Sequence, residues 1–270
     1  GDLYDQAIRN LKGLDIDCLV VIGGHGTLTS ARDFYQKGVP VIAVPKTIDN
    51  DLAFTDLTFG FMTAVDTATD AIDKLHSTAE SHHRIMVLEV MGRYAGWIAL
   101  ESGLAGGADV ILIPEIPYRI DKIAEKINQR KQNGKSFSIV VVAEGAKPLG
   151  GSMVVNKIDE NCPDPIKLGG IGHKIGQELE LATGLETRVT VLGHLQRGGA
   201  PSAFDRILAT RYGVSAVELA MAERFGMMVA LQGARITAVP IAAAVGKLKT
   251  VPLDSDLIKA ARSIDLEFGD

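Results

Sequence analysis

The chain has 270 residues, of which 46% are hydrophobic and 23% charged, so it is long enough for one large globular domain or two lobes. Its net charge of −5 and the lack of a basic run argue against a nucleic-acid-binding surface. No apolar stretch reaches the length of a membrane span and the first residues do not resemble a signal peptide, so we expect a cytoplasmic protein. The two cysteines, Cys18 and Cys162, lie far apart in sequence and do not suggest a disulfide framework.

The first predicted elements form a strand, a glycine-rich turn and a helix. Residues 4–13 have helical spacing, 18–22 form an apolar strand, and 28–37 are expected to form a helix. Between this strand and this helix lies the turn Gly23-Gly24-His25-Gly26-Thr27. Glycines let the backbone approach a ligand closely, and the N–H groups at the start of a helix bind anions such as phosphate. Such a turn is as compatible with tight strand-to-helix geometry alone as with phosphate binding.

A second loop carries two carboxylates. The apolar run 39–44 predicts a buried strand that opens into Pro45-Lys46-Thr47-Ile48-Asp49-Asn50-Asp51. If this loop stays extended, the side chains of Asp49 and Asp51 face the same way. A solvated turn is the alternative, because Asn and Asp favour turns. The two loops follow successive strands, so we expect them side by side at one edge of a sheet, where open α/β sheets bind their ligands.

The rest of the chain continues to alternate between strands and helices, which predicts an α/β fold with parallel sheets covered by helices. Helices are predicted at 61–80, 94–105, 121–132, 170–183, 203–224 and 254–263, and strands at 84–90, 109–113, 137–143, 187–193, 227–231 and 236–240. Charged or polar side chains recur where strands end, at Asp49, Arg93, Glu144, His194 and Arg197. Because the carboxyl ends of parallel strands meet at one edge, this recurrence predicts a functional site.

Five motifs occur in the order and approximate spacing of the 6-phosphofructokinase family, which the chain resembles from about residue 15 to 225. They are the two loops above, Met91-Gly92-Arg93, Glu144-Gly145 and Gly193-His194-Leu195-Gln196-Arg197-Gly198-Gly199. The resemblance implies two doubly wound lobes with largely parallel sheets covered by helices. A nucleotide or phosphoryl-donor lobe would comprise 1–60 and 196–246, and a fructose 6-phosphate lobe 61–195 and 247–270. The family's N-terminal glycine-rich strand and loop have no counterpart, so we expect the N-terminal part of the first lobe to be missing and the chain to be a fragment or a renumbered portion of a longer protein.

The resemblance implies a glycolytic reaction, the transfer of a phosphoryl group from ATP to the 1-hydroxyl of fructose 6-phosphate to give fructose 1,6-bisphosphate. Asp49 resembles the catalytic base, Thr47 would position the sugar or the phosphate, and Arg93 would stabilise charge on the transferred group. The residues that match the family's substrate contacts are Asp51, Arg84, Met91, Gly92, Glu144, Arg188, His194 and Arg197.

The residues that the resemblance assigns to the phosphoryl donor are Gly23, Gly24, His25, Gly26, Thr27 and Lys46. Pyrophosphate-using members typically carry Asp at the position of Gly26. The missing side chain leaves room for the α-phosphate of ATP, so we expect ATP as donor, with pyrophosphate as the alternative. Magnesium (Mg2+) is the expected cofactor, held by Asp49 and Asp51, because His25 stands where the family usually has an acidic residue and histidine is a poor ligand for this hard cation.

Arg84 and Arg188 match the arginines that reach the sugar's 6-phosphate from a neighbouring subunit, where a planar guanidinium suits phosphate oxygens. The resemblance therefore implies a homo-oligomer, a dimer or tetramer, with shared active sites. The alternative is that both arginines are ordinary strand-end charges paired with carboxylates. His25 and the missing front also leave open a catalytically weak regulatory subunit that binds fructose 6-phosphate. Allosteric control is common in this family, and Gly107 and Asp109 fall near its effector region.

Overall fold

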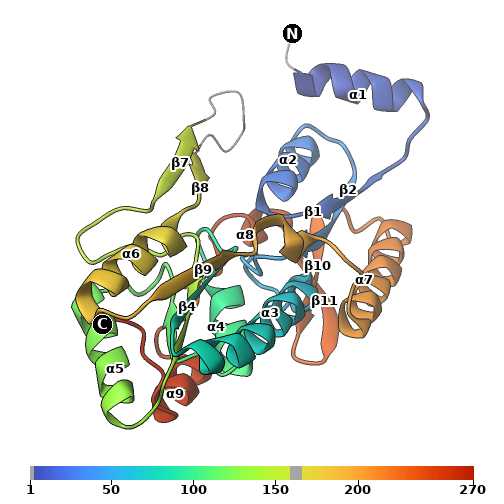
Figure 1. Cartoon of the computed structure of the whole chain (residues 1–270). Helices are drawn as coiled ribbons and strands as arrows, with labels where there is room; N and C mark the ends of the chain where they lie inside the picture. Colours follow the sequence, from blue (N-terminus) through green and yellow to red (C-terminus); the bar gives the residue numbers. More distant parts are fainter. Residues whose placement is uncertain (1–2, 159–165) are drawn as a thin grey trace. The chain divides into compact units, whose positions relative to one another are not determined.

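The computed structural model describes residues 3–158 and 166–270, and Cys162 lies outside this part. The chain forms two compact units (Figure 1). Unit 1 comprises Gly1–Met62 and Pro201–Lys249, and unit 2 comprises Thr63–Ala200 and Thr250–Asp270. None of the helices in the described residues is long and apolar enough to cross a membrane.

Unit 1 is built on a sheet with the strand order β1-β2-β10-β11, and a short strand β3 pairs with the end of β2. The strands β1, β2 and β10 are parallel, and β11 returns antiparallel to β10. Helices α2 and α8 cover one face through the cluster around Leu28, whereas α7 covers the other through the cluster around Tyr212. The strands are β1 (Leu19–Gly23), β2 (Val41–Thr47), β3 (Phe59–Gly60), β10 (Met227–Gln232) and β11 (Arg235–Pro240), and the helices are α1 (Leu3–Gly13), α2 (His25–Gln36), α7 (Ala203–Met221) and α8 (Ile241–Ala244).

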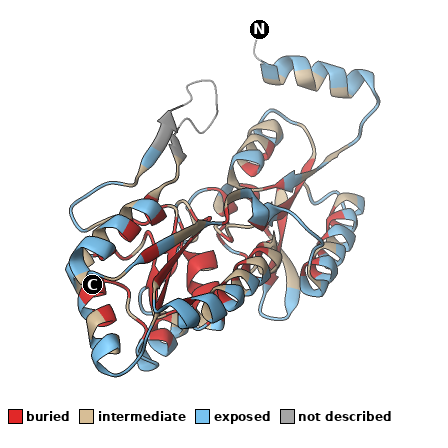
Figure 2. Cartoon of the chain, in the orientation of Figure 1, coloured by how far each residue is buried: buried red, intermediate tan, exposed pale blue. Residues whose placement is uncertain are grey.

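Unit 2 is built on a four-stranded parallel sheet with the order β5-β6-β4-β9. Both central strands are buried along their whole length (red in Figure 2), because α5 and α6 cover one face and α4 lies against the other. The strands are β4 (Ile85–Val90), β5 (Val110–Leu112), β6 (Ser138–Ala143) and β9 (Thr187–Val191). The helices are α3 (Phe61–His82), which begins at the end of unit 1, α4 (Trp97–Ala105), α5 (Ile120–Gln132), α6 (Ile171–Thr183) and α9 (Asp256–Ser263).

The predicted α/β class with largely parallel sheets is confirmed, and three local predictions are corrected. Helix α2 begins at His25, so part of the predicted glycine-rich turn forms the helix's first turn. The predicted loop at 193–199 contains a 3-10 helix, η1 (Gly193–Arg197). The antiparallel hairpin of β7 (Val155–Ile158) and β8 (Ile166–Leu168) was not predicted, because its strands are short and carry lysine and asparagine where alternation would need apolar residues.

The exits of β4 and β6 cross at very short range in unit 2. The N–H of Glu144 donates to the carbonyl of Val90 (2.9 Å), and the N–H of Gly145 donates to the carbonyl of Gly92 (3.1 Å). A Cβ atom placed on Gly145 would lie 1.9 Å from the carbonyl oxygen of Arg93. Only glycine therefore allows these two strand exits to pass each other.

We predict that Gly145→Ala strongly destabilises unit 2, because the methyl group must push the backbone of Arg93 aside. A loss of about 3 kcal/mol or more in the free energy of unfolding is expected, as for a severely overpacked site. Chemical denaturation measures it. Gly13→Ala is the matched control, since nothing lies within 4 Å of its added Cβ atom. Equal stability of the two variants would contradict the close crossing.

Candidate functional site

The two predicted loops of unit 1 lie side by side, as the sequence suggested. Strands β1 and β2 pair in parallel up to Gly23 and Pro45, so both end at the same edge. A Cβ atom on Gly24 would lie only 3.3 Å from the Cβ atom of Thr47. The glycine-rich turn and the Asp49 loop are therefore in direct contact.

The first turn of α2 presents its backbone at this edge. Gly23 has no room for a side chain because Thr27 folds against it, with the side-chain atoms of Thr27 2.5 to 2.7 Å from a built Cβ atom. Gly26 faces open space, since nothing lies within 4 Å of its built Cβ atom. The N–H groups of this turn begin a helix of 12 residues, and Lys46, near the end of the neighbouring strand β2, is exposed. These features together favour an anionic ligand.

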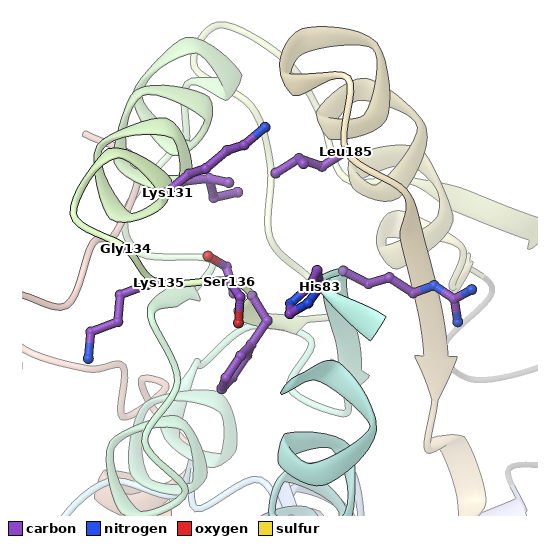
Figure 3. Close-up of a pocket in the computed structure, with 10 residues that line it drawn as sticks. His83, Lys131, Gly134, Lys135, Ser136 and Leu185 are labelled. Atoms are coloured by element: carbon purple, nitrogen blue, oxygen red, sulfur yellow. The ribbon is translucent and has the colours of Figure 1, made fainter. Parts of the chain in front are cut away.

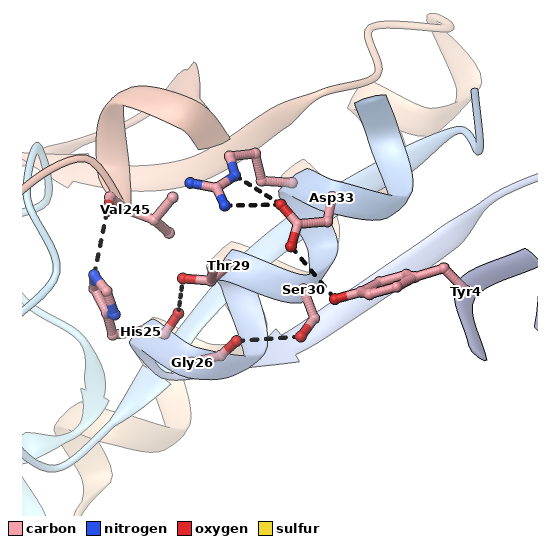
Figure 4. A network of polar contacts seen from close by, with 8 residues as sticks. Tyr4, His25, Gly26, Thr29, Ser30, Asp33 and Val245 are labelled. Carbon is pink, nitrogen blue, oxygen red and sulfur yellow. Dashed lines mark hydrogen bonds and ion pairs between the residues drawn. The ribbon is translucent and has the colours of Figure 1, made fainter. Parts of the chain in front are cut away.

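The ring of His25 is held in one orientation by the carbonyl group of Val245, the residue that follows α8 (Figure 4). Its Nε2 lies 3.2 Å from the carbonyl oxygen of Val245, which can only accept, so Nε2 carries a proton and donates it there. Farther along α2, Thr29 and Ser30 return hydrogen bonds to the carbonyls of His25 and Gly26. His25 is thus a fixed part of the turn.

The Asp49 loop is a turn, so the condition under which Asp49 and Asp51 would face the same way is not met. The N–H of Asp49 donates to the Oγ1 atom of Thr47 (3.2 Å), and this hydroxyl lies 3.5 Å from Oδ2 of Asp49. Asn50 then has a φ of 51°, in the left-handed region that asparagine tolerates better than most residues. Asp49 stays half-buried beside Thr47.

A buried amide holds this turn in place. The side chain of Asn50, 2% exposed, accepts from the N–H of Thr58 (3.1 Å) and from Nζ of Lys249 (3.0 Å) and lies 3.4 Å from the carbonyl of Asp56. The same ammonium donates to the carbonyls of Thr55 and Asp56. Lys249 also donates its backbone N–H to the carbonyl of Asp51 (2.8 Å). The hydrogen bonds of Asn50 and Lys249 therefore hold the turn against residues 55–58. The sequence did not reveal this role.

Asp51 is a partly desolvated carboxylate. Its Oδ1 atom is buried and has no hydrogen-bond partner among the described residues. Burial raises the pKa of Asp51 above its usual value, against the opposing effects of a backbone hydrogen bond and the charges of His25 and Lys249. Within residues 3–158 and 166–270, no group of three or more His, Cys, Asp or Glu side chains forms a metal site. Any hard cation here would need oxygens from a ligand as well as Asp51.

In unit 2, residues from three strand exits meet at the carboxyl edge of the sheet. Met91, Gly92 and Arg93 follow β4, Glu144 follows β6, and η1 follows β9. The N–H of Met91 donates to Oε1 of Gln196 (2.7 Å), whose side chain is 1% exposed. Gln196 thus ties η1, with His194 and Arg197, to the exit of β4. Gln196 lies in the predicted motif 193–199, but no role was predicted for it.

Three of the predicted contact residues, Met91, Glu144 and His194, line one cavity of about 500 Å³, whereas Arg197 is exposed beside it. Glu89 and His173 line the same cavity and were missed. Glu89 is 3% exposed and accepts hydrogen bonds from the N–H groups of Gly172 (2.8 Å) and Gly170 (3.4 Å) at the start of α6. The sequence did carry a signal for Glu89, because it is a carboxylate within the apolar run 85–90. Such a group is rarely buried unless it is paired.

Arg84 and Arg188 lie at the other edge of this sheet. Arg84 precedes β4 and Arg188 is next to the start of β9, so about 20 Å of strand separates them from Met91, at about 3.3 Å per residue. Both arginines pair with Glu186, and the hydrogen bond from Arg84 is the main reason that the pKa of Glu186 lies below its usual value. These ion pairs are those of the alternative reading, and the predicted contact of both arginines with a sugar phosphate in a neighbouring subunit stays a prediction.

Arg84 also borders a basic cavity at this amino edge (Figure 3). The cavity measures about 290 Å³, and the cationic residues Arg84, Lys131 and Lys135 line it together with His83. Because none of the described residues that line it is a carboxylate, the amino edge of the sheet favours anions.

We predict that Asn50→Ala lowers the free energy of unfolding by about 2 to 4 kcal/mol, because it leaves the buried N–H of Thr58 and the Lys249 ammonium without their acceptor and puts alanine at a left-handed φ. Chemical denaturation measures the loss, and exposed Asn10→Ala on α1 is the control. A variant as stable as the control would show that the amide does not hold the loop.

The chain resembles known proteins over its whole length. A family model described as "Phosphofructokinase" matches residues 2–220. The chain is 59% identical over 270 residues to the ATP-dependent 6-phosphofructokinase 2 of Clostridium perfringens and 57% identical over 269 residues to the ATP-dependent 6-phosphofructokinase of Chloroflexus aurantiacus. Each alignment covers 100% of this chain and 74% of the relative.

A solved structure supports the same assignment. The pyrophosphate-dependent phosphofructokinase of Marinobacter aquaeolei superposes with a TM-score of 0.81 at 25% identity, covering 99% of this chain and 72% of that one. Family model, sequence relatives and fold agree, and the chain belongs to the phosphofructokinase family.

Proposed function

We propose that this protein is a 6-phosphofructokinase that transfers the γ-phosphoryl group of ATP to the 1-hydroxyl of fructose 6-phosphate. The observation that carries the proposal is the 59% identity, over the whole chain, to a relative named for this reaction. Two features of the structure support the proposal. Unit 1 offers a helix start to phosphates, and unit 2 offers a polar cavity to a sugar.

The sugar cavity of unit 2 matches hydroxyl groups better than phosphate. Glu89 and Glu144 supply acceptors, and His173 and His194 can donate or accept, whereas the described part of the lining contains no arginine or lysine. A polyol with many hydroxyls can satisfy such a set of groups. We assign the ring of fructose 6-phosphate to this cavity, with Met91 packing against it and Arg197 outside the lining.

Asp49 is the proposed general base. Its carboxylate accepts the proton of the sugar's 1-hydroxyl while that oxygen bonds to the γ-phosphorus and the bond to the ADP oxygen breaks, so ADP leaves with the electron pair. Thr47 donates to Asp49 and orients it. Arg93 stabilises the charge on the transferred group. The transition state is loose, so catalysis here depends mainly on position and charge.

Magnesium (Mg2+) fits unit 1 through Asp51 and Asp49, because a buried carboxylate oxygen without a partner suits a hard cation that takes its remaining ligands from phosphates and water. Bound there, the ion would neutralise charge on the donor phosphates. His25 does not fit as a ligand, because its Nε2 donates to the carbonyl of Val245. In addition, Mg2+ prefers oxygen ligands to an imidazole nitrogen.

Arg84 and Arg188 are assigned to the active site of a neighbouring subunit. They lie about a strand length from Met91 of their own chain, and their edge of the sheet attracts anions. A homo-oligomer, a dimer or tetramer, with shared sites follows from this assignment. As a glycolytic enzyme, the protein would work in the cytoplasm.

We predict that Asp49→Asn lowers kcat by about 10²- to 10⁴-fold, because an amide cannot accept the hydroxyl proton. The affinity for fructose 6-phosphate should stay within about twofold, as expected for a group that acts in the transition state. A coupled assay for the bisphosphate and calorimetric binding of the sugar phosphate measure the two effects. Asp56→Asn on the same loop is the control, and unchanged turnover of Asp49→Asn would remove the base assignment.

The donor is the second point to test, since the superposed solved structure is named pyrophosphate-dependent and the sequence relatives are named ATP-dependent. We predict turnover with ATP and little with pyrophosphate. Gly26→Asp should abolish ATP use without unfolding the protein, because its new side chain enters open space where the nucleotide would lie. Kinetics with both donors decide this. Normal ATP kinetics in Gly26→Asp would contradict the steric argument, and binding of sugar phosphate without turnover in the wild type would favour a regulatory subunit.

A further inference from the structure

A second cavity of unit 2, of about 470 Å³, lies beside Arg93. We propose that it binds the phosphate on carbon 1 of the sugar bisphosphate and that Lys147, which nothing above assigns, is the second cation of this subsite. The proposal rests on the proposed function. The cavity is lined by Arg93, Tyr94, Lys147, Gly151, Ser152, Met153, Val155 and Leu168.

The backbone brings Lys147 close to Arg93. Gly145 lies so near the carbonyl oxygen of Arg93 that a built Cβ atom would be 1.9 Å away, and Lys147 follows two residues later. Tyr118 fixes that segment on both sides, because its N–H donates to the carbonyl of Lys147 (3.0 Å) and its carbonyl accepts from the N–H of Leu149 (2.8 Å). The position of Lys147 relative to Arg93 is therefore set by buried backbone contacts.

The charges of this cavity call for an anion. Among the described residues that line it, Arg93 and Lys147 are cationic and none is a carboxylate. Among the described residues no carboxylate pairs with the Lys147 ammonium. The guanidinium of Arg93 lies over the ring of Tyr94, 5.1 Å from its centre, which holds it in place. Met153, Val155 and Leu168 make the remaining wall apolar, so water screens the two charges less than on an open surface.

The neighbouring sugar cavity has the opposite character. Its lining, as far as the structure describes it, contains Glu89 and Glu144 but no arginine or lysine, and Leu168 borders both cavities. One ligand can therefore place its hydroxyls in the acidic cavity and a phosphate in the basic one. The 1-phosphate is the group that fits, because Arg93 is the residue already assigned to the transferred phosphoryl group. Lys147 would donate to its oxygens through a charge-assisted hydrogen bond.

Calorimetric titration of the purified full chain with fructose 1,6-bisphosphate and with fructose 6-phosphate tests the proposal. Lys147→Met should weaken bisphosphate binding about tenfold and leave monophosphate binding within about twofold. Lys147→Arg should restore bisphosphate binding, because it keeps the charge and a comparable reach. Lys174→Met on α6, outside both cavity linings, is the matched control and should leave both affinities unchanged.

The outcomes separate this subsite from the proposed reaction. Unchanged bisphosphate affinity in Lys147→Met, or an equal loss for both ligands, overturns the subsite even if the wild type turns over normally. If wild-type protein forms no bisphosphate from either donor but binds it in a Lys147-dependent way, the proposed function fails and the subsite stands. Circular dichroism of Lys147→Met should match the wild type, and the Lys147→Arg result provides a second readout should Lys147→Met be misfolded.

Discussion

The geometry of unit 1 depends on one buried amide. Asn50 occupies a left-handed conformation between the two carboxylates and takes hydrogen bonds from Thr58 and Lys249. Lys249 comes from the far end of the unit's sequence, so the turn is closed by a contact that forms only when the unit is folded. The position of Asp49 is therefore a property of the folded unit, because 45–51 alone has too few local contacts to hold it. This explains how a loop can carry a group that must be placed to within a fraction of an ångström.

In unit 2, close backbone contacts and buried polar side chains hold the strand exits in place. The crossing at Gly145 sets the exit of β6 against that of β4, and Gln196 ties η1 to Met91. Glu89 ties the start of α6 to β4, because its carboxylate accepts the N–H of Gly172. Each contact is buried, so each satisfies a backbone N–H that would otherwise cost free energy. The cavity that they enclose can then keep its shape without a ligand.

Periodicity and strand-exit chemistry predicted the α/β class and most element positions, and they singled out Glu144 and His194 among the residues that line the cavity at the carboxyl edge of unit 2. These sequence patterns did not predict the local features that depend on tertiary contacts. The start of α2 at His25 depends on a ring bonded to Val245, and the turn at Asn50 depends on Lys249. Neither partner is near in sequence. Glu89 was visible as a charge in a buried strand, but its partners at Gly170 and Gly172 are known only from the fold.

The distribution of charge in unit 2 indicates which chemical group of a substrate each of its two cavities would take. Carboxylates and histidines line the cavity at the centre of the carboxyl edge, and Arg93 and Lys147 line the cavity next to it. A phosphate would be repelled from the first by Glu89 and Glu144 and attracted to the second. Hydroxyls, being neutral, can enter the acidic cavity and satisfy its acceptors. The separation of the two charge types therefore fits the proposed placement, in which the sugar hydroxyls occupy the acidic cavity and the 1-phosphate of the bisphosphate lies beside Arg93 and Lys147.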